Sequence, residues 1–105
     1  MKVTIFGTGT WGTGLAQVLC DNGHHVLMYG IEPSQVADIN KFHRNSFFFD
    51  DEIVLHDNIK ATLSLKEAID YSDIFLLSVP SVAMRSLLHE ISKQLSKKVL
   101  IINTA

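Results

Sequence analysis

The sequence predicts an α/β fold with a doubly wound parallel sheet, in which the strands lie in the order 3-2-1-4-5 and helices cover both faces. Short apolar runs alternate with amphipathic segments along the chain, a glycine-rich turn follows the first apolar run, and 105 residues suit one domain. This alternation implies parallel strands joined by right-handed crossovers. A ligand crevice is then expected beyond the C-terminal ends of the strands.

Apolar spacing defines the opening strand and helix. Residues 2–6 predict a strand, and residues 10–22 predict a helix with one apolar face, formed by Leu15, Val18 and Leu19. Gly23 is well placed to end this helix in a left-handed conformation. The single cysteine, Cys20, lies within the helix, where we expect a small buried side chain that forms no internal disulfide.

The second strand and helix follow directly. Residues 25–29 predict a strand, residues 30–33 a turn, and residues 34–40 a helix, since Pro33 suits a first helical position. Residues 41–57 have no clean period and contain three consecutive phenylalanines. We expect a loop there, with a short strand over residues 53–55.

The second half of the chain repeats the alternation. Residues 59–63 predict the third strand, and Ser64 and Glu67 have the capping-box spacing that begins a helix reaching about residue 71. Residues 73–79 are almost entirely apolar, as in a strand buried on both faces. Helical spacing of apolar residues predicts a helix over residues 81–95, and residues 98–103 predict the final strand.

The glycine turn carries the main functional signal. Gly7, Gly9 and Gly12 form a Gly-x-Gly-x-x-Gly motif between a strand and a helix, which is typical of a dinucleotide site in a Rossmann-type domain. Gly7 would permit the tight turn, Gly9 would let a diphosphate approach the backbone, and Gly12 would let the helix pack closely. Free N–H groups at the helix start would face the phosphates. The alternative is a plain strand-to-helix turn.

Composition restricts the partners. The net charge is −2 without a basic block, which gives no sign of nucleic acid or an anionic membrane, and no apolar run approaches the length of a membrane span. Because the N-terminus enters a strand without a signal segment, we expect a cytoplasmic protein. None of the five histidines has metal-ligand spacing with another ligand, and we expect no metal site.

Residues 7–16, with Thr10 and Trp11 inside the motif, resemble the opening of bacterial NAD(P)-dependent glycerol-3-phosphate dehydrogenases. Tryptophan before the third glycine is the distinguishing feature. Further similar segments follow in register, namely Asn22-Gly23-His24, Ile39-Asn40 with Asn45, Ser78-Val79-Pro80-Ser81 and residues 101–105.

The resemblance implies that residues 1–105 are an NAD(P)-binding domain and that a helical C-terminal substrate domain is absent from this chain. It implies interconversion of dihydroxyacetone phosphate and sn-glycerol 3-phosphate by hydride transfer with NAD or NADP, and a product that feeds phospholipid synthesis. It also places the catalytic lysines outside these residues. The fragment alone is therefore expected to bind a dinucleotide without turnover, and a phosphorylated substrate would need the missing domain.

Carried over residue by residue, the resemblance gives a set of cofactor-binding candidates: Gly7, Gly9, Thr10, Trp11, Gly12, Ile31, Glu32, Phe48, Val79 and Pro80. Thr10 stands where the family often has serine, and its hydroxyl and N–H could bond a phosphate oxygen. Trp11 could cover the diphosphate or the mouth of the crevice. Alternatively, it is a partly exposed aromatic residue at a domain interface.

Two departures from the family pattern bear on the cofactor. The usual ribose-binding acid is replaced by Gly30, followed by Ile31 and Glu32, and the family commonly has arginine at the Ile31 position. Glu32 could accept a ribose hydroxyl and would repel a 2′-phosphate, which favours NAD over NADP, although the helix dipole would favour this acid in any case. Phe48 replaces a family tyrosine and lies within Phe47-Phe48-Phe49, which is either an interface or a small buried cluster.

A stand-alone nucleotide-sensing module without catalysis is the alternative function, since fold does not fix function. Another 2-hydroxy or 3-hydroxy acid dehydrogenase is a further alternative. An absent partner domain would leave apolar surface exposed, which predicts self-association and allows a homodimer.

Overall fold

The computed structural model describes residues 1–46 and 53–104, in which strands and helices alternate as expected. The elements in chain order are β1 (Lys2–Phe6), α1 (Thr10–Asp21), β2 (His25–Tyr29), α2 (Pro33–Phe42), β3 (Ile59–Thr62), α3 (Leu65–Tyr71), β4 (Ile74–Leu77), α4 (Ser81–Gln94) and β5 (Leu100–Asn103).

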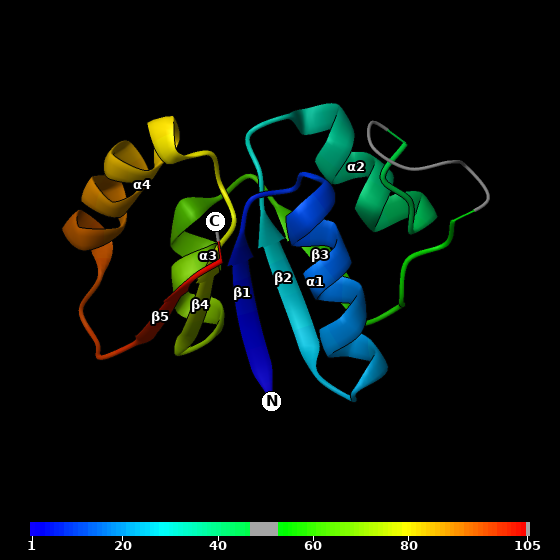
Figure 1. Ribbon diagram of the computed structural model, residues 1–105, viewed down its shortest axis with the longest axis horizontal. Helices are drawn as coiled ribbons and strands as arrows, with labels where there is room; N and C mark the ends of the chain where they lie inside the picture. Colours follow the sequence, from blue (N-terminus) through cyan, green and yellow to red (C-terminus); the bar gives the residue numbers. More distant parts are fainter. Residues whose placement is uncertain (47–52, 105) are drawn as a thin grey trace.

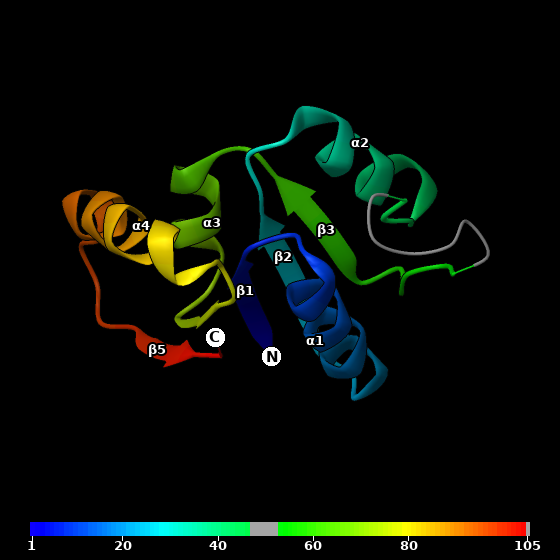
Figure 2. The ribbon, with the colours of Figure 1, turned by 45° about the horizontal axis from the view of Figure 1, so that its top comes forward.

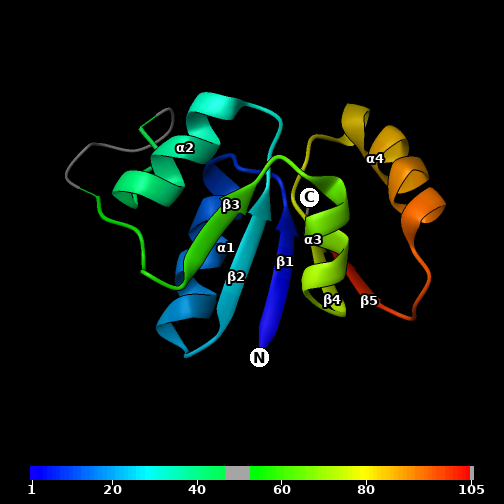
Figure 3. The ribbon, with the colours of Figure 1, turned by 180° about the vertical axis from the view of Figure 1, so that it is seen from behind.

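The strands form one parallel sheet in the order β3-β2-β1-β4-β5 (Figure 1), which confirms the predicted fold class and strand order. Thr4 of β1 is in register with Leu27 of β2 on one side and with Phe75 of β4 on the other. Helices α1 and α2 lie in front of the sheet in Figure 1, whereas α3 lies in front when the molecule is seen from behind (Figure 3).

Two apolar clusters, one on each face of the sheet, form the core. Because side chains alternate along a strand, Val3 and Ile5 of β1 pack on the α1 face and Phe6 packs on the α3 face. There Phe6 meets Phe75 edge to face, with 5.1 Å between ring centroids. Strands β1 and β4 thus pack on both sides of the sheet, which confirms the two-sided burial that the apolar run of residues 73–79 predicted for β4.

Helix α1 contacts the sheet partly through the expected face, since Leu15 and Leu19 are partly buried against the core cluster on this side of the sheet. Its fully buried side chains include Thr13, Ala16 and Cys20, while Val18 is 58% exposed. The expectation that Val18 belongs to the buried face was therefore wrong. Cys20 is buried as predicted, and this burial raises the pKa of its thiol.

Local turn chemistry accounts for two helix boundaries. Gly23 has φ +89° after the C-cap residue of α1, which confirms the predicted left-handed stop. At the start of α3, the Ser64 hydroxyl accepts a hydrogen bond from the Glu67 N–H at 3.1 Å, as a capping box requires. The Ser64 N–H donates to the Thr62 hydroxyl at 3.0 Å, and this bond replaces the one that the Glu67 carboxylate would accept in a complete capping box.

Residues 53–55 do not form the short strand that the sequence suggested. The Leu55 N–H donates to the carbonyl of His43 at 2.6 Å, so this segment is held against the end of α2 rather than paired in the sheet. His43 has φ +53° at the C-cap of α2, a conformation that reverses the chain there.

The β5 edge of the sheet is sparsely covered. All four residues of β5 are exposed, and Ile91 is the single fully buried residue of α4. Figure 2 shows β5 at the outer edge of the sheet, with α4 on one side of it. Among the described residues, no helix has the length and apolar character needed to cross a membrane.

Candidate functional site

The glycine turn between β1 and α1 is held by close backbone packing. Gly7 has φ +128°, a conformation that L side chains rarely adopt, and a Cβ there would lie 2.9 Å from the Ser78 carbonyl oxygen. A Cβ at Gly12 would lie 2.8 Å from the Gly7 carbonyl oxygen and 2.5 Å from the Ser78 hydroxyl. The predicted reasons for glycine at both positions, a tight turn and close helix packing, are confirmed.

The same turn presents unpaired amides on its outer side. The first hydrogen bond of α1 joins the Thr13 N–H to the Gly9 carbonyl at 3.0 Å, and Gly9 provides no side-chain cap. Within residues 1–46 and 53–104, nothing accepts from the N–H groups of residues 9–12. A Cβ at Gly9 would meet no atom within 4 Å. These amides and the positive end of the helix dipole therefore face open space, an arrangement suited to an anion.

A cleft of ≈ 1210 Å³ opens beside this turn, at the C-terminal ends of the strands. It brings together most of the candidate residues, namely Gly7, Gly9, Thr10, Trp11, Ile31, Val79 and Pro80. Gly12 lies beneath the turn and Glu32 lies outside the cleft lining, while Phe48 and the rest of Phe47-Phe48-Phe49 lie outside the described residues. The rest of the wall comes from one face of α4 and from Thr8, Tyr29, Leu65, Ser78 and Thr104.

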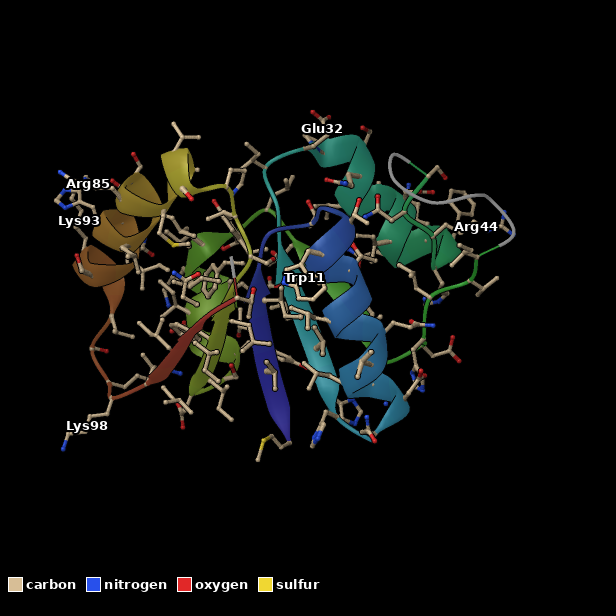
Figure 4. All side chains as sticks on the ribbon, viewed as in Figure 1. Trp11, Glu32, Arg44, Arg85, Lys93 and Lys98 are labelled. Atoms are coloured by element: carbon tan, nitrogen blue, oxygen red, sulfur yellow. The ribbon has the colours of Figure 1, made fainter. Side chains whose placement is uncertain are left out.

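Trp11 links the turn to the far end of the sheet. Its indole Nε1–H donates to the Thr104 carbonyl at 3.0 Å, and its side chain remains 61% exposed (Figure 4). Trp11 thus forms part of the cleft wall between α1 and the segment that follows β5. Sequence reasoning did not find Thr104, because the contact is to a carbonyl and joins residues 93 positions apart.

The position usually held by a ribose-binding acid is sterically closed. A Cβ at Gly30 would lie 2.6 Å from Cγ2 and 2.8 Å from Oγ1 of Thr8, so the Thr8 side chain occupies that space. Ile31 is 84% exposed beside it. Glu32 is the N-cap residue of α2, where its Oε1 accepts from the Ser34 hydroxyl at 3.1 Å.

Fixed cations are sparse around this cleft. Of the described side chains that line it, Glu90 alone carries a charge. Figure 4 shows Arg44 on one flank of the molecule and Arg85, Lys93 and Lys98 on the other, away from Trp11 and Glu32. An anion in the cleft would therefore be held mainly by backbone dipoles.

A buried polar cluster beneath the turn was missed by the sequence analysis. Thr8, Thr13, Gln35 and Asn45 are each at most 8% exposed and are joined by hydrogen bonds. Gln35 is polar at a buried helical position, which is the one signal that could have pointed to it. In the described residues, no group of three or more histidine, cysteine or acidic side chains is placed to hold a metal ion.

Comparisons with known proteins agree with this geometry. Residues 2–105 match the family described as "NAD-dependent glycerol-3-phosphate dehydrogenase N-terminus". The chain is 47% identical over 104 residues to a glycerol-3-phosphate dehydrogenase [NAD(P)+] of Mesoplasma florum, covering 99% of this chain and 31% of the relative. It is also 47% identical over 106 residues to the protein of the same name from Acholeplasma laidlawii, covering 100% of this chain and 30% of that protein.

Solved structures show the same likeness. The crystal structure of a glycerol-3-phosphate dehydrogenase from Coxiella burnetii superposes with a TM-score of 0.89 at 25% identity, covering 97% of this chain and 31% of that one. A glycerol-3-phosphate dehydrogenase from Saccharomyces cerevisiae gives a TM-score of 0.85 at 26% identity, covering 98% and 33%. The chain spans about a third of the length of the curated relatives it matches.

Proposed function

The chain belongs to the family of NAD-dependent glycerol-3-phosphate dehydrogenase N-termini, and on this premise we propose that residues 1–105 are the cofactor domain of an oxidoreductase. The whole enzyme would interconvert dihydroxyacetone phosphate and sn-glycerol 3-phosphate and supply the latter to phospholipid synthesis. Residues outside this chain would contribute the substrate chemistry. The domain itself would bind NAD or NADP, in a protein of the cytoplasm.

The row of amides at residues 9–12, which donate to no acceptor among the described residues, is the observation that carries this proposal. The turn fits a diphosphate because the space over Gly9 is open within 4 Å, while Gly7 and Gly12 are packed from behind. The cleft of ≈ 1210 Å³ exceeds the usual ligand pocket of roughly 300–1,000 Å³, which leaves room for both halves of a dinucleotide. Once bound, the nicotinamide ring would carry the hydride, and the residues described here would bind and orient it.

We further propose that the site prefers NAD to NADP. Thr8 occupies the space that a side chain at position 30 would need, and Glu32 is the first acid in sequence after β2. Its charge would repel a 2′-phosphate, and the exposed Ile31 offers that phosphate no hydrogen-bond donor. The scarcity of cations in the described cleft lining supports the same preference.

Calorimetric titration of the chain with NADH and NADPH tests both proposals. NADH should bind, and NADPH should bind about three- to fivefold more weakly, as expected for one exposed like-charge contact. Ile31→Arg should narrow or reverse this ratio, because a guanidinium would face the 2′-phosphate. Val18→Arg is the matched control, since it adds the same charge on an exposed part of α1. A folded chain that bound neither dinucleotide would refute the site.

A turnover assay tests the division of labour. The chain mixed with NADH and dihydroxyacetone phosphate should not oxidise NADH, whereas the full-length Mesoplasma florum relative serves as the positive control. Brisk oxidation by the chain alone would contradict the placement of the substrate chemistry outside residues 1–105.

A further inference from the structure

The four buried residues beneath the glycine turn form a continuous set of hydrogen bonds, here called the amide network: Thr8, Thr13, Gln35 and Asn45. The Gln35 Nε2 donates to the Thr8 carbonyl at 2.9 Å and to Asn45 Oδ1 at 3.1 Å. The Asn45 Nδ2 donates to the same Thr8 carbonyl at 2.8 Å and to the Thr13 hydroxyl at 2.9 Å. The Thr8 hydroxyl donates to Gln35 Oε1. The network therefore converges on Thr8, a residue of the turn itself.

Two amide donors fix the orientation of the Thr8 carbonyl. A carbonyl oxygen has two lone pairs, and side chains from α2 and from the segment after it each bond to that oxygen at 2.9 and 2.8 Å, while the Thr13 hydroxyl is a longer third donor at 3.5 Å. In a trans peptide, the N–H of the following residue points opposite to the carbonyl, and no described peptide bond is cis. Holding the Thr8 carbonyl inward thus turns the Gly9 N–H outward, where no described residue accepts from it.

A need to fill space in the core does not explain why the Gln35 and Asn45 side chains are polar. Buried amides cost free energy unless they are paired, and apolar groups of similar shape can replace a buried polar pair at little cost. Gln35 and Asn45 are 6% and 1% exposed, and both bond the carbonyl of one turn residue. Their polarity is therefore directed at the backbone of the turn.

We propose that Gln35 and Asn45 are positioning residues for dinucleotide binding: their amides hold the Thr8 carbonyl and so aim the Gly9 N–H at the diphosphate. This inference rests on the proposed function of the glycine turn. Neither side chain touches the ligand. They would act through the orientation of the peptide between Thr8 and Gly9, and their loss would be measured as a weaker affinity for the diphosphate-bearing cofactor.

Replacement of each amide by an isosteric apolar group tests the proposal. Gln35→Met and Asn45→Leu should each weaken binding of NAD⁺ about tenfold, the effect of misaligning one hydrogen bond to a charged group. Thr4→Val is the matched control. Thr4 is buried, donates to the Ala68 carbonyl at 2.9 Å and contacts the Ser72 hydroxyl at 2.8 Å, on the α3 face of β1 away from the turn. It should lower the melting temperature while leaving the dissociation constant for NAD⁺ unchanged.

Asn45→Asp provides a rescue that a purely structural role would not produce. Its carboxylate would place an acceptor against the Thr8 carbonyl, and NAD⁺ binding should be weak at alkaline pH. Burial raises the pKa of an introduced carboxyl, so lowering the pH should protonate it, restore a donor and recover affinity. Wild-type affinity should stay flat over the same range. The Gly9 amide resonance, followed by NMR, should shift in step with affinity.

The outcomes are distinct. Variants that fold and bind NAD⁺ within twofold of wild type would overturn the positioning role. An Asn45→Asp variant whose affinity did not recover at acidic pH would overturn it as well, even if the apolar variants failed to fold. A wild-type chain that folded but did not bind would instead refute the proposed function on which this inference depends.

Discussion

At the scale of single residues, the structural reasons for glycine differ among the three glycine positions of the turn. Gly7 combines a positive φ with a carbonyl 2.9 Å from where its Cβ would stand, and Gly12 is packed against backbone at 2.8 Å. Neither a positive φ nor a close backbone contact requires glycine at position 9, since a side chain there would point into open space. Gly7 and Gly12 thus serve the fold, whereas no described contact requires glycine at position 9, which agrees with the proposed approach of a diphosphate there.

Alanine substitutions separate these two reasons. Gly12→Ala should lower the free energy of unfolding by about 2 kcal/mol, because its methyl group would overlap the Gly7 carbonyl and the Ser78 hydroxyl. Gly9→Ala should cost less than about 1 kcal/mol, the effect of alanine at an N-cap, yet it should weaken NAD⁺ binding. Urea denaturation and calorimetry measure the two effects. Equal losses of stability in both variants would contradict the distinction.

The sequence was informative at this scale where spacing carries the signal. Gly7 and Gly12 occupy the positions that the motif predicts, and the structure supplies the contacts that require them. The proximity of Thr8 to Gly30 and the amide network were not predicted. The first depends on the side chains that follow the paired ends of β1 and β2, and the second on which side chains of α2 and the segment after it reach the turn. A one-dimensional pattern does not specify which side chains meet across separate elements.

At the scale of elements, the outer edge of β3 is closed by a side chain. The Asn40 Nδ2 donates to the Ala61 carbonyl at 2.8 Å, and the Ala61 N–H donates back to Asn40 Oδ1 at 2.7 Å. The amide of one helical residue thus pairs with β3 as a neighbouring strand would. This pairing satisfies backbone groups that an edge strand otherwise leaves open.

Asn40→Ala should loosen this edge without unfolding the domain. We expect hydrogen exchange of the Ala61 amide to accelerate about tenfold, because its acceptor is lost and local opening becomes easier. Asn22→Ala is the control, since the Asn22 side chain makes a single exposed hydrogen bond, to the Val18 carbonyl at the end of α1. Unchanged exchange at Ala61 in the Asn40 variant would show that the pairing has no energetic effect.

Element boundaries were predictable where local rules act strongly. The bounds of β1 and β2 agree with those expected from their apolar runs, and Gly23 and Ser64 mark helix ends as their chemistry requires. Residues 53–55 were misassigned because an apolar triplet has the composition of a strand, but the hydrogen bond from Leu55 to His43 is non-local. Val18 was misplaced because helical spacing alone does not identify the face that meets the sheet.

At the scale of the whole molecule, the two edges of the sheet are treated differently. The β3 edge is closed by Asn40, whereas β5 exposes Leu100, Ile101 and Ile102, each at least 41% exposed. Leu100 and Ile102 are in register with Ile74 and Leu76, which belong to the cluster on the α1 face. The apolar surface on this side of β5 is therefore continuous with the core.

This surface predicts self-association of the chain. Contiguous exposed apolar groups favour contact between copies, so the mean mass in sedimentation velocity should rise with concentration. Leu100→Lys combined with Ile102→Lys should keep the chain monomeric. Val82→Lys is the control, since Val82 is 91% exposed on α4, outside this strand. A wild-type chain that stayed monomeric at all accessible concentrations would contradict the prediction.

The Thr8 side chain occupies the space that a Cβ at position 30 would need, and this constrains how the site can evolve. An acidic residue at position 30, the common solution to ribose recognition, would place its Cβ 2.6 Å from the Thr8 methyl group. The Thr8 hydroxyl in turn donates to Gln35 Oε1, so a residue without a hydroxyl at position 8 would leave that amide oxygen without this donor. The effects of substitutions at positions 8 and 30 therefore depend on each other. A saturation library at residue 30 alone should contain only variants with weaker dinucleotide binding, and a variant with tighter binding would require a substitution at position 8 as well.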